Sequence, residues 1–327
     1  MPNDTEVYRQ YVIDEFLEDY QTRRVSRRDT LKLLAGVTGS LSVAGVLMAA
    51  CAPAAPAPTA APAPTTPAAP PTATARPANT PVPDDQKVAA TDPAIKAETI
   101  TFKNGADTIT AYLARPAAGN GPFPAVMECH ENRGLSPYNQ DVTRRLAKSG
   151  YVGLALDLLS REGGTAKNDF NAIPGMLTTA GVPRHVSDFK AAFEYLQAQP
   201  FVNKDKVGML GFCFGGGVTL STILQVPGIK AAVPFYGPVP GDLSNAKNIG
   251  AAVFGVYGEL DNNVNPRMPE LQKALTEAGK TFQSKIYPGA PHAFHNDLNE
   301  NGDRYNAVQA KQAWTDAMAW FDKYLKA

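Results

Sequence analysis

The sequence predicts an α/β protein in which a mostly parallel central sheet is covered by helices on both faces. Short apolar segments alternate with helical segments through residues 92–327, as expected for strands that are buried on both sides. The run G-F-C-F-G-G at 211–216 follows one apolar segment directly, which is typical of a sharp strand-to-helix turn. We therefore expect one globular domain over 92–327.

The elements follow from apolar runs bounded by turn and cap residues. Asn104-Gly105 is a turn signal between the first two expected strands, so these should form an antiparallel hairpin. Gly150 ends the first expected helix. The expected strands are 98–102, 109–114, 124–130, 151–156, 207–212, 229–236, 251–257 and 281–287. The expected helices are 138–149, 184–197, 214–224, 266–278 and 305–325.

The first 51 residues are predicted to be an export signal. Arg27 and Arg28 precede an apolar stretch that is interrupted by glycine, serine and threonine, which resembles a twin-arginine signal for a protein exported already folded. The end of this stretch, L-M-A-A-C at 47–51, resembles a lipobox, in which Cys51 is acylated. The alternatives are a transmembrane anchor helix and an ordinary cleavage site with an incidental cysteine.

Residues 52–91 are predicted to be a linker, since they consist largely of alanine, proline and threonine. Such a tract cannot build a core and behaves as a semi-rigid tether. We therefore expect an extracytoplasmic enzyme that is attached to the membrane through lipid on Cys51 and recognised by the export machinery through Arg27 and Arg28.

Composition narrows the possible functions. The 31 basic and 31 acidic residues give a formal net charge of zero, so there is no electrostatic reason to expect a nucleic-acid partner. Three cysteines are too few to indicate a disulfide scaffold. The chain has no phosphate-binding glycine loop of the P-loop or dinucleotide type, and we expect neither a cofactor nor a metal.

Cys213 is the candidate nucleophile. Its sequence matches the nucleophile elbow of the α/β-hydrolase fold, with sulfur in place of the usual serine oxygen. A strained backbone would lift the sulfur clear of the sheet, and Gly211 and Gly215 would avoid the collisions that side chains make there. The alternative is a buried core cysteine beside a tight turn.

Asp261 and His292 complete a candidate triad. Each follows a late expected strand, and parallel sheets bind ligands at the carboxyl ends of their strands. An imidazole can take the thiol proton, and a carboxylate on its far nitrogen fixes the tautomer. Glu259 competes with Asp261 for this role. The other histidines are His130, His185 and His295.

These segments together resemble the dienelactone hydrolase family over about residue 98 to the end. The resemblance rests on G-F-C-F-G-G at 211–216, on H-E-N-R-G at 130–134 and on the separations between Cys213, Asp261 and His292. It implies that Glu131 contacts the resting thiol until substrate displaces it, although a purely structural carboxylate is the alternative. It also implies an oxyanion hole made by the backbone N–H groups of Phe214 and Asn132.

One departure from the family bears on the substrate. The founding enzymes have an arginine four residues after the histidine, where this chain has Asn296. Arg133 and Arg184 are the candidates to replace it. We expect hydrolysis of a small ester or lactone through an acyl-thioester on Cys213. The alternatives are a non-catalytic ligand-binding lipoprotein and a peptidase of the same fold.

Overall fold

The centre of the protein is an eight-stranded sheet in the order β1-β2-β4-β3-β5-β6-β7-β8. The computed structural model describes residues 3–50, 87–119, 121–298 and 304–327. The pairs β1–β2 and β2–β4 are antiparallel, and the remaining pairs are parallel. The strands are β1 (Ile95–Asn104), β2 (Asp107–Pro116), β3 (Phe123–Cys129), β4 (Val152–Leu156), β5 (Val202–Phe212), β6 (Ala231–Phe235), β7 (Ala252–Gly258) and β8 (Phe282–Tyr287).

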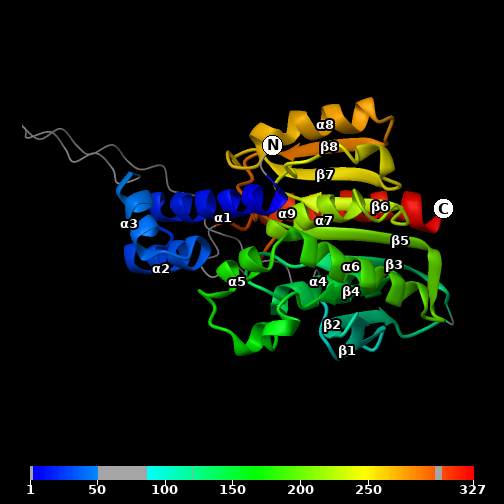
Figure 1. The fold of residues 1–327 in the computed structure, drawn as a ribbon. Coiled ribbons are helices and arrows are strands. Elements are labelled where there is room, and N and C mark those ends of the chain that lie inside the picture. The colour runs from blue at the N-terminus through cyan, green and yellow to red at the C-terminus, as the bar shows by residue number, and fades with distance from the viewer. Residues whose placement is uncertain (1–2, 51–86, 120, 299–303) are drawn as a thin grey trace, which may run out of the picture.

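Helices cover both faces of this sheet (Figure 1). They are α4 (Pro137–Lys148), α5 (Ile173–Ala180), α6 (Val182–Gln197), α7 (Phe214–Ile223), α8 (Met268–Glu277) and α9 (Ala307–Phe321). Gly208 of β5 lies against Phe321 at the end of α9, whereas Gly211, three residues later, lies against Gly215 of α7. Residues an odd number apart in a strand face opposite ways, so α7 and α9 lie on opposite faces. The predicted α/β-hydrolase fold is confirmed.

Local signals explain several boundaries. The β1–β2 pairing closes on Asn104 opposite Asp107, with Gly105 at a φ of +59° in the turn. Helix α4 begins with a capping box, in which the side chains of Ser136 and Asn139 each accept from the other's backbone N–H. Helix α5 was not expected, because its eight residues include proline and glycine and show no long helical period.

The N-terminal residues form three helices, α1 (Asp4–Gln21), α2 (Arg27–Thr38) and α3 (Leu41–Ala50). Figure 1 shows them as the blue segment beyond the carboxyl ends of the parallel strands. Arg27 and Arg28 are exposed in the first turn of α2, which Ser26 caps. Cys51 and most of the predicted linker lie outside the described residues. No helix in the described part of the chain has the length and apolar character needed to cross a membrane.

Candidate active site

Cys213 lies at the tip of a strained turn between β5 and α7. Its φ of 57° and ψ of −124° are unfavourable for a residue with a side chain. Both neighbouring glycines are required, since a Cβ on Gly211 would lie 2.1 Å from the Gly215 carbonyl oxygen, and one on Gly215 would lie 2.3 Å from the Cys129 oxygen. The local sequence thus forms the elbow geometry that it predicts.

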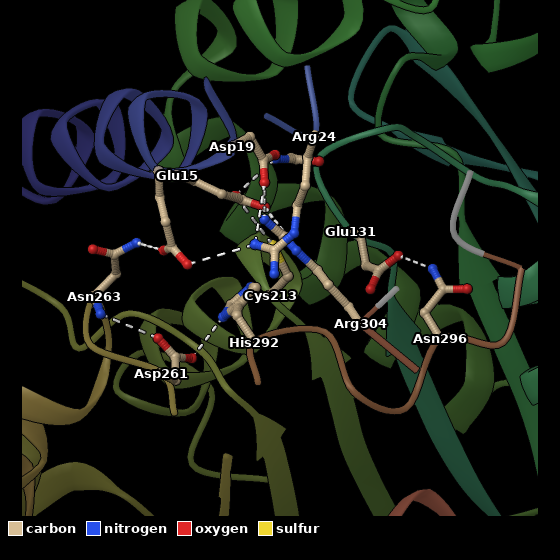
Figure 2. A network of polar contacts seen from close by, with 12 residues as sticks. Glu15, Asp19, Arg24, Glu131, Cys213, Asp261, Asn263, His292, Asn296 and Arg304 are labelled. Atoms are coloured by element: carbon tan, nitrogen blue, oxygen red, sulfur yellow. Dashed lines mark hydrogen bonds and ion pairs between the residues drawn. The ribbon is translucent and has the colours of Figure 1, made fainter. Parts of the chain in front are cut away.

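His292 and Asp261 meet beside this turn. Nδ1 of His292 lies 2.6 Å from Oδ2 of Asp261, and both side chains are buried (Figure 2). The other oxygen of Asp261 accepts from the backbone N–H groups of Asn263 and Val264, which fixes the carboxylate. The thiol sulfur and a nitrogen of the imidazole lie within 4.8 Å of each other. The structure therefore brings the three predicted residues together.

The alternative candidates for the acid and for the histidine form hydrogen bonds elsewhere. Glu259 accepts from the backbone N–H of Gly289, outside this cluster. His130, His185 and His295 bond to the Glu131 carbonyl, the Leu177 carbonyl and the Tyr138 hydroxyl, respectively.

Helix α1 also reaches into the site, a contact that the sequence did not predict. The Tyr11 hydroxyl lies 3.1 Å from Sγ of Cys213 and 2.9 Å from Nε2 of His292, so it bonds to both the thiol and the imidazole. Asp4, Tyr8, Tyr11, Glu15 and Asp19 recur every three or four residues, and that spacing predicts one helix face. No local signal indicates where this face packs.

Glu15, also on α1, bonds to the thiol through its carboxylate. Its Oε2 lies 3.7 Å from Sγ of Cys213 and accepts from the side-chain amide of Asn132 at 3.0 Å. Its Oε1 lies 3.2 Å from Nη1 of Arg304, whose guanidinium also pairs with Asp19. Figure 2 shows Glu15 and Asp19 extending from the helix toward Cys213 and Arg304.

Glu131 makes no hydrogen bond to the thiol in the part of the chain that the structure describes, whereas the family resemblance implied such a contact. Oε2 of Glu131 accepts from Nδ2 of Asn296 at 2.5 Å, and Oε1 is buried with no hydrogen-bond partner among the described residues. The residue that replaces the family's arginine thus holds Glu131, and Glu15 occupies the place beside the sulfur. Burial raises the pKa of Glu131 to about 7, against the lowering effect of the Asn296 amide.

The two predicted arginines behave differently. Arg133 lines the cavity, donates to the carbonyl of Phe170 and lies over the rings of Phe16 and Phe170. Arg184 pairs with Glu162 at 2.6 Å and is not among the residues that line the cavity, so the structure does not support a contact between Arg184 and substrate. Arg304, which the sequence analysis did not single out, lines the cavity instead.

The electrostatics of the site depend on α1. Burial, and after it the charge of Glu15, raise the pKa of the Cys213 thiol, while His292 opposes them. Burial lowers the pKa of His292, but the charges of Asp261 and Cys213 outweigh that effect and raise it well above its usual value. A positive imidazole beside the sulfur favours the thiolate, whereas Glu15 disfavours it.

The cavity beside Cys213 has a volume of about 470 Å³, enough for a small organic substrate. Glu15, Phe16 and Asp19 of α1 form one wall, and Glu131, Asn132, Arg133, Cys213 and Arg304 contribute to the rest. Glu15, Cys213 and His292 are the one group of possible metal ligands in the described ranges. The Tyr11 hydroxyl already bonds to the sulfur and to the imidazole, so hydrogen bonds account for this cluster.

Comparisons with known proteins identify the family to which this chain is similar. The model of the dienelactone hydrolase family matches residues 109–325. A protein of Escherichia coli O157:H7 named "Putative carboxymethylenebutenolidase" is 32% identical over 252 residues, which cover 72% of this chain and 90% of that protein. The crystal structure of a "Putative Dienelactone Hydrolase" from Klebsiella pneumoniae has a TM-score of 0.65 at 28% identity and is matched over 71% of this chain and 100% of its own. A dienelactone hydrolase-like promiscuous phosphotriesterase from metagenomic libraries has the same TM-score at 25% identity, over 71% of this chain and 99% of its own.

Proposed function

Because the chain belongs to the dienelactone hydrolase family, we propose that it hydrolyses a small ester or lactone through a covalent thioester on Cys213. Family membership identifies the chain as a hydrolase, and the proposal concerns its substrate class and its mechanism. The observation that carries it is the contact of 2.6 Å between His292 and Asp261, beside a cysteine held at the tip of a strained turn.

The first half-reaction forms the thioester. Nε2 of His292 takes the proton from Sγ, and the thiolate adds to the substrate carbonyl carbon. The N–H of Phe214 is the first of helix α7 and has no intrahelical acceptor, so it can stabilise the oxyanion together with the N–H of Asn132. The bond from carbon to the leaving oxygen then breaks, and that oxygen takes the proton from His292.

The second half-reaction releases the acid. Water gives a proton to His292 and adds to the thioester carbonyl, after which the carbon–sulfur bond breaks and the sulfur recovers the proton. Asp261 keeps Nδ1 protonated throughout and stabilises the imidazolium. In a lactone the leaving oxygen stays attached to the product, so a single hydroxy acid is formed.

A panel of p-nitrophenyl esters and unsaturated lactones, assayed with the wild type and with Cys213→Ala, tests this proposal. We expect hydrolysis by the wild type, loss of it in the variant, and an acylated Cys213 peptide in the mass spectrum of quenched wild type. Equal turnover by both proteins would refute the mechanism. Ligand retention without hydrolysis would favour the alternative of a binding lipoprotein.

We also propose that the chain is exported and attached to a membrane by lipid on Cys51. Arg27 and Arg28 are exposed, which supports recognition by the export machinery. Leu41 and Val46 on α3 are exposed apolar residues, which supports contact of this segment with a membrane or a protein partner. Metabolic labelling with a fatty acid tests the anchor. Absence of label on the wild type, or equal label on Cys51→Ser, would refute it.

A further inference from the structure

Helix α1 forms hydrogen bonds to the catalytic domain near both of its ends. Asp4 accepts from the backbone N–H groups of Gly241 and Asp242, at 2.9 and 3.2 Å. At the other end, Oε2 of Glu18 accepts from the side chain of Asn263 at 2.6 Å. The helix is therefore held at both ends, with its centre over the sulfur.

The centre of α1 fills the space that a reacting substrate needs. A carbonyl carbon poised for attack lies about 3–3.5 Å from its nucleophile, and the Tyr11 hydroxyl already lies 3.1 Å from Sγ of Cys213. The same hydroxyl bonds to Nε2 of His292, the atom that must accept the thiol proton. Cys213 is only 2% exposed in this arrangement. The sulfur cannot attack a substrate while Tyr11 stays in place.

The carboxylate of Glu15 also occupies space beside the sulfur. It bonds to the amide of Asn132 and pairs with Arg304, which line the cavity. Those two side chains hold this anion next to the sulfur, as they would hold an acidic group of a substrate. The charge of Glu15 also raises the pKa of the thiol, second to burial, so the docked helix disfavours the reactive thiolate.

We propose that helix α1 is an inhibitor within the same chain, which closes the active site by placing Tyr11 between Cys213 and His292 and the Glu15 carboxylate on Arg304. The enzyme is inactive while the helix is docked and becomes active when the helix leaves. Only the turnover readout rests on the proposed ester hydrolysis. Access to the sulfur is a separate property.

Two glycines of the catalytic domain are in close contact with the N-terminal segment. A Cβ on Gly217 of α7 would lie 2.5 Å from the Tyr8 hydroxyl, and one on Gly175 of α5 would lie 2.5 Å from the backbone oxygen of Gly36 in α2. Residues 51–86 join α3 to the catalytic domain. A tethered helix acts at an effective concentration on the order of millimolar, so an affinity of about 0.1 mM would leave roughly a tenth of the molecules open. Cleavage of this tether would remove that advantage.

The test uses the full chain with a site for a sequence-specific protease inserted in the Pro/Ala/Thr tract. Two rates are measured before and after cleavage and removal of the released segment. One is alkylation of Cys213 by iodoacetamide, followed by peptide mass spectrometry to separate it from Cys51 and Cys129. The other is hydrolysis of p-nitrophenyl acetate. We expect both rates to rise about tenfold or more, and a synthetic peptide of residues 3–24 to lower them again.

Point variants of the uncut chain provide the matched control. Tyr11→Phe removes the hydroxyl that bonds to Cys213 and His292, and each lost hydrogen bond should open the site about threefold to tenfold. Tyr20→Phe makes the same change on the same helix, away from the sulfur, and should leave both rates unchanged. A peptide carrying Tyr11→Phe and Glu15→Gln should inhibit the cleaved enzyme less than the natural one.

The outcomes separate this proposal from the proposed function. Alkylation that is unchanged or slower after the segment has been removed would overturn the inhibitory role. Faster alkylation without hydrolysis of any ester would support it and would refute the proposed chemistry instead.

Discussion

The turn around Cys213 and the helix α1 contribute equally close contacts to one site, yet they depend on the sequence in different ways. The turn is determined locally, because Gly211 and Gly215 leave room for backbone that lies within a few residues of them or on the neighbouring strand. Helix α1 depends on contacts between residues about 200 or more positions apart, such as Tyr11 with Cys213 and with His292. The turn can therefore be predicted from a few consecutive residues, whereas the docking of α1 cannot.

The largest expected effect tests the catalytic side of this comparison. Asp261→Asn removes the carboxylate that holds Nδ1 of His292, and we expect kcat for p-nitrophenyl acetate to fall about 10²- to 10⁴-fold. Glu259→Gln is the control, since Glu259 bonds to Gly289 outside the triad. Steady-state kinetics of the cleaved enzyme measure both. Similar losses in the two variants would mean that the triad has been assigned to the wrong carboxylate.

A smaller effect is expected from weakening the contact between the N-terminal segment and the catalytic domain. Gly175→Ala places a methyl group 2.5 Å from the Gly36 oxygen, so the segment must shift away and iodoacetamide should alkylate Cys213 about three times faster or more. Gly36→Ala changes the other residue of this contact. Its methyl group points away from Gly175 into open space, with nothing within 4 Å. Cys213 of that variant should be alkylated at the wild-type rate. Equally faster alkylation of Cys213 in both variants would count against a specific docking surface.

The charge of Glu15 should be visible in a pH profile. Glu15→Gln removes a charge that raises the pKa of the thiol, so the alkylation rate of Cys213 should rise with pH at a lower pH than in the wild type. The other ionisable groups that interact with the sulfur, namely Tyr11, Cys129, Glu131, Tyr236 and His292, are unchanged. Asp14→Asn, one position earlier on α1, should leave the profile where it is. A profile unmoved by either variant would contradict the effect of Glu15.

A further expected effect concerns stability. The pKa of Glu131 is about 7 in the folded protein and near 4.5 in the unfolded chain, so folding takes up a proton between these values. Stability from this group is fully present below about pH 4.5 and is lost as pH rises through 7. Glu131→Gln should make the free energy of unfolding less dependent on pH across this window, by about 2 kcal/mol. Urea titrations at pH 5 and pH 8 measure it, and parallel pH dependence in both proteins would refute it.

The fold and the meeting of Cys213, Asp261 and His292 at one site could be predicted because their signals are local. Apolar runs indicated all eight strands, with ends that differ by up to five residues, and the elbow and the loop after β8 carry chemistry that few other roles require. Helix α5 could not be found, since eight residues containing proline and glycine have no distinct period. The arrangement around Glu131 was also missed. A resemblance transfers a role by position, but the partner of Glu131 is Asn296, where this chain departs from the family.

The contact between Gly215 and β3 has a mechanical consequence for the proposed oxyanion hole. A Cβ on Gly215 would lie within 2.5 Å of the carbonyl oxygens of both Cys129 and His130, so the first turn of α7 rests directly on the segment that leads to Asn132. The two proposed N–H donors, of Phe214 and Asn132, therefore belong to backbone segments that contact each other through Gly215. If these two groups form the proposed oxyanion hole, we expect its geometry to be set before a substrate binds.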